Sequence, residues 1–432
     1  MKLNKFWPKA ALLFAILYTI NISYKNIEHP GNLIWSDMEG YYTYLPSVFI
    51  YGDFVKEAVK DTNYIRPYKD TQKIYSKYTC GVAMLEMPFF LISHVVAGLK
   101  GENQGGKSPI YGRGLAFAGL FYLWVGMLFL YKLGIRYYEK KWVILSILSI
   151  LLGTNLYYYT FFQPAMSHVF SFGIISIFLY LTDTIFIKNK RVNNPLTTWM
   201  IYGFVMGLII LIRPTNIILL ILPLYIWYKD ENAKLQWIRQ HLIPLLITAI
   251  TAFITFLPQF IYWKYISGDW IIYSYGDESF KFWKEPKLFR VLFDAWNGWI
   301  LYSPIVLLPL YFLIKGRNSN QNYERAYLII FALATYIFAS WWAWWFGGAF
   351  GHRSYVELLT LLVLPLAGLL QQSYKTKAYF ITMSIFIIIL CYYNLGLTYA
   401  YRPPWDGENW TYDSLIYQIK KIFFWRNRLK VK

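Results

Sequence analysis

Two carboxylates stand two residues apart in an aromatic segment near the start of the chain, at Asp37 and Glu39. A carboxylate in such a place can take the proton of an acceptor hydroxyl as a general base, and a pair can hold a divalent cation through oxygen ligands. We therefore treat Asp37 and Glu39 as candidate catalytic residues, and Tyr41 and Tyr42 as candidate substrate-binding residues. The plainer alternative is an ordinary acidic pair in a solvated loop.

An arginine lies between two short apolar runs, in the sequence Arg213-Pro214-Thr215-Asn216. An arginine at membrane depth is costly, and it normally pairs with an acid or lines a polar cavity. Its planar guanidinium also matches a pair of phosphate oxygens. Arg213 is thus a candidate phosphate-binding residue, and a structural ion pair is the alternative.

A segment rich in tryptophan and glycine covers positions 341–357. Glycine lets a backbone approach a ligand closely, and the indole of Trp345 offers a flat face on which a sugar ring can stack. His352 and Arg353 supply donors for phosphate oxygens, so both are candidate phosphate-binding residues, while Trp345 and Glu357 are candidate substrate-binding residues. The alternative is an aromatic belt at a membrane interface, anchored by one positive charge.

Two more side chains are candidates for contact with a substrate. Lys77 precedes an apolar run at 81–99 that could form a helix roofing a cavity, and His168 follows the turn that begins at Gln163-Pro164. A helix that merely anchors the chain, and a histidine that caps or packs, are the alternatives. No second histidine stands at ligand spacing from His168, so the pattern does not support a histidine metal site.

The composition shows what kind of protein must position these residues. Of 432 residues, 57% are hydrophobic and 15% are charged, against about 45–50% and about 25% in a soluble domain. Two cysteines cannot make a disulfide framework, and the net charge of +19 comes from cations that flank apolar segments rather than from a nucleic-acid surface. The chain also has no nucleotide-binding phosphate loop. We expect an all-α, multi-spanning membrane protein.

Apolar runs predict about eleven transmembrane helices. They lie near 6–24, 114–131, 142–160, 167–187, 198–212, 215–228, 242–263, 299–314, 326–345, 355–370 and 378–400. The fifth and sixth are short and meet at Arg213-Pro214, where proline disfavours a continuous helix. We expect the run 81–99 to lie at the membrane surface, because counting it as a span moves every later loop to the wrong side.

The distribution of cations predicts the orientation. Eighteen Lys and Arg fall on the N-terminus and the inner loops, against two in the short outward loops, as the positive-inside rule requires for a cytoplasmic N-terminus. Residues 1–400 then form one transmembrane domain with large outward loops at 25–113 and 264–298. Residues 401–432 form a short outward tail, expected to be amphipathic at the membrane surface. The predicted location is a bacterial-type inner membrane, with the active side facing outward.

In this order, the motifs resemble the polytopic GT-C glycosyltransferases, close to the branch of protein O-mannosyltransferases and aminoarabinose transferases. The resemblance covers most of the chain and rests on five segments: Asp37 to Tyr42, Lys77 to His94, Gln163 to His168, Gly207 to Asn216, and the Gly-Gly-x-x-Gly-His-Arg run that ends at Arg353.

This resemblance implies a polyprenyl-phosphate sugar donor that enters from the membrane, a lipid, glycan or protein acceptor, and transfer with inversion. Asp37 matches the carboxylate that is taken as general base, and Arg213 matches the basic position at the phosphate, with Arg353 and His352 as second candidates. Some relatives carry two adjacent acids, whereas Met38 separates Asp37 from Glu39 here. Whether a divalent cation binds near these acids is left open, and neither a nucleotide cofactor nor a nucleic-acid partner is expected.

Two other functions compete with transfer of a single sugar. A polysaccharide polymerase or ligase would have a similar number of spans, but we expect several arginines in its large outward loop, and 25–113 holds only Arg66 and Arg113. A transporter or flippase of lipid-linked sugars usually has inverted repeats with broken helices. This sequence shows one Arg-Pro break and no matching one in its other half.

Overall fold

The computed structural model describes residues 33–54, 64–69, 73–188, 195–229, 234–315, 323–402, 405, 407 and 409–424. The described residues are mostly helical and form two compact units, one within Met1–Phe129 and Tyr159–Asp277, and the other within Leu130–Tyr158 and Glu278–Lys432. The expected first span at 6–24 lies outside the described residues.

Within the described residues, six helices are long and apolar enough to cross a membrane. They are Gly81–Leu99 (α4), Pro109–Gly134 (α5), Ser167–Ile187 (α8, Ser167–Asp183, continued by η4, Thr184–Lys188), Leu242–Ser267 (α12), Arg353–Ser373 (η7, Arg353–Leu362, and α17, Val363–Ser373) and Lys377–Ala400 (α18). A mostly helical chain with several helices able to span a membrane is therefore confirmed, and the number of spans stays a prediction. Five of the six match expected spans, and the sixth, α4, is the run that we expect at the membrane surface.

The other expected spans are shorter or interrupted. The run 142–160 divides into α6 (Lys140–Gly153) and α7 (Leu156–Phe161) at Thr154, whose backbone is extended. The Thr154 hydroxyl donates to the Ile150 carbonyl at 2.6 Å and accepts from the Leu156 N–H at 3.3 Å, so the side chain competes with the helix.

Proline and an early helix end account for the remaining differences. The run 299–314 divides into α14 (Trp299–Tyr302), η6 (Pro304–Val306) and α15 (Leu307–Lys315), because Pro304 disfavours helix at the residue before it. Helix α16 (Glu324–Ser340) ends before the tryptophan segment. The break expected at Arg213 is present, between α9 (Leu196–Ile212) and η5 (Pro214–Leu220), which continues as α10 (Ile221–Lys229).

The first unit begins with short elements that carry the acidic motif. These are α2 (Asp37–Tyr42), α3 (Tyr44–Pro46), η3 (Ser47–Tyr51), β1 (Ile65–Pro67) and β2 (Ile74–Ser76). The two strands pair antiparallel, with Arg66 opposite Tyr75, a small sheet that the all-α expectation does not include. The Ser76 hydroxyl donates to the Gly40 carbonyl at 2.6 Å, which holds α2 beside the start of α4.

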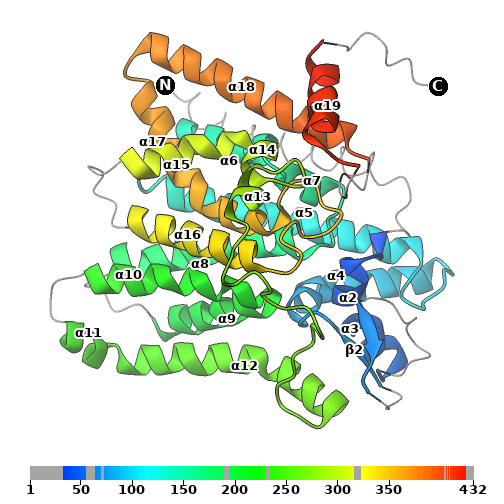
Figure 1. Cartoon of the computed structure of the whole chain (residues 1–432). Coiled ribbons are helices and arrows are strands. Elements are labelled where there is room, and N and C mark those ends of the chain that lie inside the picture. The colour runs from blue at the N-terminus through cyan, green and yellow to red at the C-terminus, as the bar shows by residue number, and fades with distance from the viewer. Residues whose placement is uncertain are drawn as a thin grey trace. The chain divides into compact units, whose positions relative to one another are not determined.

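Three helices of the first unit, α8, α9 and α12, pack side by side in chain order (Figure 1). Helices α9 and α12 approach closely at Gly203 and Gly207, where a Cβ atom would meet Thr248 and Thr255 of α12 within 3.0 Å. Glycine is needed at both positions because a larger residue would push the helices apart. Helix α11 (Lys234–Gln240) precedes α12.

In the second unit, α6 packs on both α17 and α18, and α17 also contacts α15. Helix α13 (Leu288–Phe293) lies in the segment expected as the second outward loop. The expected tail contains α19 (Tyr412–Phe424), which packs on α18 where Ile422 meets Gly396. Its position on a membrane surface stays a prediction.

Candidate functional site

Helix α2 places Asp37 and Tyr41 on one face, because residues four apart are neighbours on a helix. Both side chains are buried, at 5% exposure each. The chain enters the helix through Ser36, whose positive φ of 57° turns it sharply, and the Glu39 N–H donates to the Ser36 carbonyl. The local turn thus brings an acid into the unit's interior.

The buried Tyr41 hydroxyl lies near both an acid, Asp37, and a cation, Arg213. It donates to the Ser167 hydroxyl at 3.2 Å, and its ring stacks on Tyr78 with centroids 4.3 Å apart. Burial raises the pKa of Tyr41, the negative charge of Asp37 raises it further, and the positive charge of Arg213 lowers it. Asp37 and Arg213 therefore both lie within electrostatic reach of one buried hydroxyl.

Arg213 occupies the break after α9, in extended backbone with φ −149°. Its Nη1 lies 3.2 Å from Nδ1 of His168, at the start of α8. Since a guanidinium can only donate, Nδ1 accepts and the neutral imidazole carries its proton on Nε2. The His168 ring also packs edge-on against Tyr159, with centroids 4.8 Å apart. His168 thus helps to orient the guanidinium.

The start of α4 packs against the end of α9, directly before Arg213. A Cβ at Gly81 would lie 2.5 Å from the backbone of Leu211 and Ile212, so glycine is required for this contact. The Thr79 hydroxyl donates to the Leu211 carbonyl, and the Cys80 N–H donates to Gln259 Oε1 of α12 at 2.7 Å. Three helices therefore meet beside Arg213.

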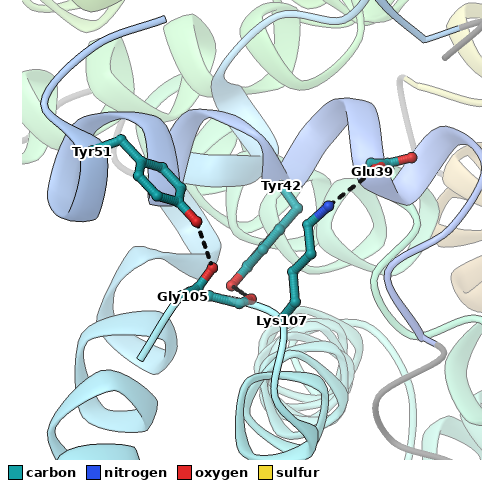
Figure 2. A network of polar contacts seen from close by, with 6 residues as sticks. Glu39, Tyr42, Tyr51, Gly105 and Lys107 are labelled. Carbon is teal, nitrogen blue, oxygen red and sulfur yellow. Dashed lines mark hydrogen bonds and ion pairs between the residues drawn. The ribbon is translucent and has the colours of Figure 1, made fainter. Parts of the chain in front are cut away.

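Glu39 and Tyr42 face a glycine-containing loop instead. Glu39 lies 3.6 Å from Lys107, and the Tyr42 hydroxyl donates to the Gly106 carbonyl at 2.5 Å. Figure 2 shows both contacts, together with the bond from the Tyr51 hydroxyl to Gly105. Because residues two apart do not share a helix face, Glu39 has different surroundings from Asp37.

Lys77 lies beside the rings of two tyrosines, Tyr78 and Tyr275. Lys77 Nζ is 5.2 Å from the Tyr275 ring centroid and 5.8 Å from that of Tyr78. The Ser274 hydroxyl donates to the Lys77 carbonyl at 2.7 Å. The second expected outward loop therefore contributes to this region. Ser167 could have been found from its place beside His168, whereas no signal in the sequence indicates Tyr275.

The remaining candidates belong to the second unit. His352 is fully buried, its Nε2 lies 3.0 Å from the Trp344 carbonyl, and its ring stacks on Phe338. Trp345 stacks on Trp296, with centroids 4.4 Å apart. This packing holds the tryptophan segment in place around His352.

Arg353 is the first residue of η7, and Glu357, 2% exposed, lies one turn further along. The structure thus brings together Asp37, Tyr41, His168 and Arg213 in the first unit, with Lys77 nearby. It places Trp345, His352, Arg353 and Glu357 on neighbouring segments of the second unit.

Comparison with protein-family models, curated proteins and solved structures finds no match for this chain.

Proposed function

We propose that this protein is a membrane glycosyltransferase that moves a sugar from a polyprenyl-phosphate donor to an acceptor hydroxyl on the outer face of the membrane. The observation that carries the proposal is geometric: Asp37 and Tyr41 are buried on one face of α2, the Tyr41 hydroxyl donates to Ser167, and the next residue, His168, lies 3.2 Å from Arg213. A base and a phosphate-binding cation are the two groups that such a transfer needs. The order of the sequence motifs agrees with this assignment.

In the proposed reaction, the acceptor hydroxyl gives its proton to the Asp37 carboxylate while its oxygen bonds to the anomeric carbon. The bond from that carbon to the phosphate oxygen breaks, and the electron pair stays on the phosphate. Arg213 stabilises the added negative charge through two parallel hydrogen bonds, and His168 orients the guanidinium. No nucleotide is required, because the phosphate leaving group is already part of the donor.

The other candidates take supporting roles in this proposal. Lys77 attracts the anionic donor, and Tyr41 and Tyr42 hold α2 in position. Glu39 fixes α2 to Lys107 rather than acting on the substrate. The candidates of the second unit, Trp345, Arg353 and Glu357, have no assigned step in this proposal, and His352 positions the tryptophan segment that precedes it.

The test is mass spectrometry of envelope glycolipids, glycans and glycoproteins from a deletion strain restored with each variant. Asp37→Asn keeps the shape of the side chain and removes its basicity, so we expect transfer to fall by about 10²–10⁴. The matched control is Asp269→Asn, an exposed acid in the same unit, which should restore the missing sugar fully. Normal transfer by Asp37→Asn at equal protein level rejects Asp37 as the base.

The same strains separate this proposal from its competitors. Loss of one sugar increment from a lipid, glycan or protein names the acceptor and supports a transferase. Loss of long polymers with retention of single repeat units would identify a polymerase or ligase instead. Unchanged glycans, with undecorated lipid-linked sugar accumulating on the cytoplasmic side, would identify a flippase.

A further inference from the structure

Glu86, in the second turn of α4, is a buried acid of the first unit that has no place in the proposed reaction. Its side chain is 1% exposed, and neither carboxyl oxygen has a hydrogen-bond partner among the described residues. An ionised carboxylate in such a place loses its hydration without compensation, which strongly disfavours the charged form. The folded protein therefore favours the neutral, protonated form of the Glu86 side chain.

Three tyrosine hydroxyls of α2 and α5 donate their protons to backbone carbonyls and not to this carboxyl. Tyr42 of α2 donates to the Gly106 carbonyl, at 2.5 Å. Tyr122 of α5 donates to the carbonyl of Leu85, the residue before Glu86, at 3.3 Å. Tyr111 of α5 donates to the Gln104 carbonyl at 3.2 Å. Helix α2 packs on α4, and the Tyr42 ring contacts Phe90, one turn along from Glu86. Burial raises the pKa of Tyr42, and the negative charge of Glu86 raises it further.

Among the residues that the structure describes, no compensating charge comes from the elements packed on α4. Helices α2, α3, α8 and α9 all contact α4, yet within the described ranges no charged side chain acts on the Glu86 carboxyl. The nearest titratable group on α4 itself is His94, two turns further along the same face, with Phe90 between them. His94 Nδ1 lies 2.6 Å from the Tyr111 hydroxyl, and Phe90 packs on both Tyr42 and Tyr111.

We propose that Glu86 is a proton-binding site, and that release of its proton opens the contact between α2 and α4. An ionised Glu86 must draw in water or a cation, and Tyr42 of α2 packs on Phe90, one turn along α4 from Glu86, where the two helices meet. Tyr42 lies one turn after Met38 in the helix that carries Asp37. The inference does not depend on the transfer reaction, because its readouts are the protonation state and the stability of the protein.

The direct test is infrared spectroscopy of the purified protein in lipid nanodiscs at neutral pH, with and without ¹³C-labelled glutamate. We expect a carboxylic-acid C=O band that shifts with the label, disappears in Glu86→Gln and persists in Glu139→Gln. Glu139 is a suitable control because it is exposed and pairs with Lys141 at 3.2 Å. If Glu86→Gln does not fold, Glu86→Asp serves the same purpose by moving the band. Absence of a protonated band assigned to Glu86 overturns the proposal.

The second test is the unfolding equilibrium as a function of pH. The unfolded chain releases the proton above about pH 4.3, while the folded pocket retains it. The stability contributed by Glu86 is therefore complete below that pH and declines as the pH rises, by up to about tenfold in the equilibrium constant per pH unit. Glu86→Gln should remove this component, and Glu139→Gln should keep it. An identical pH dependence in wild type and Glu86→Gln, or stability that follows sodium concentration rather than pH, contradicts a proton site.

Discussion

The contact between Arg213 and His168 decides how the guanidinium can be used. The hydrogen bond from Nη1 to Nδ1 occupies one edge of the fork. The backbone around Arg213 is also fixed, since the Asn216 N–H donates to the Arg213 carbonyl at 2.9 Å. A phosphate would therefore meet an arginine whose position and orientation are set before binding, which lowers the entropy lost on association.

Replacement of this arginine by lysine tests the role of the fork. Arg213→Lys keeps the charge and removes the paired donors, so we expect donor affinity to fall by about 1.5–3 kcal/mol, the value of a hydrogen bond to a charged group. The measurement is titration of purified protein with a polyprenyl-phosphate sugar. Arg402→Lys is the control, since Arg402 donates to carbonyls at the end of α18. Equal donor affinity in Arg213→Lys and wild type would remove Arg213 from the site.

At this scale the sequence identified residues but not their partners. Asp37, His168 and Arg213 were each predictable as candidates, because charged or polar side chains beside apolar runs need a reason to be there. Their convergence near Tyr41 depends on how α2, α8 and α9 pack, and no local pattern encodes that. The contact of Glu39 with Lys107 was equally hidden, since these residues are far apart in sequence.

Among the secondary-structure elements, apolar composition predicted where helices occur better than where they stop. The break at Arg213 was predictable because Pro214 follows it. The break at Thr154 was not, because the competition of one hydroxyl with the backbone leaves hydropathy unchanged. Segments that read as single spans, such as 142–160, therefore become two helices.

Because α4 packs closely on the end of α9, we expect the methyl group added by Gly81→Ala to lower the stability of the protein. Gly81→Ala would place Cβ 2.5 Å from backbone atoms that cannot move aside, so we expect a loss of about 1–3 kcal/mol, as for other overpacked cores. Thermal unfolding in detergent measures it. Gly98→Ala, in the same helix, is the control because its Cβ would meet the movable end of the Gln104 side chain. Equal stability of the two variants would contradict the close contact.

For the whole molecule, the contacts around α4 bear on which side of the membrane its two flanking segments lie. The loop after α4 folds back onto the helix of the acidic motif, through Lys107 with Glu39 and Gly106 with Tyr42. Meanwhile Ser76, before α4, bonds to Gly40 of the same helix. Both flanks of α4 thus contact α2, which favours a surface position for α4 over a crossing.

Cysteine labelling tests this topology. With a membrane-impermeant maleimide on intact spheroplasts, we expect Asn103→Cys and Asp269→Cys to react. Lys141→Cys should react only after permeabilisation, since it lies on a loop predicted to be cytoplasmic. The wild type gives the background, because Cys80 is buried and Cys391 half-buried. Protection of Asn103→Cys in spheroplasts would show that α4 crosses the bilayer.

The packing of Gly81 on the backbone before Arg213 has a mechanical consequence. Where backbone meets backbone, no side chain can rotate to absorb a displacement, so a shift at the start of α4 is passed directly to the end of α9. Much of α4 is apolar and exposed, including Ile92 and Val95 at 62% and 60%, and this surface suits contact with lipid. A change in bilayer thickness or lateral pressure that tilts α4 would therefore displace the end of α9 and, with it, the Arg213 guanidinium.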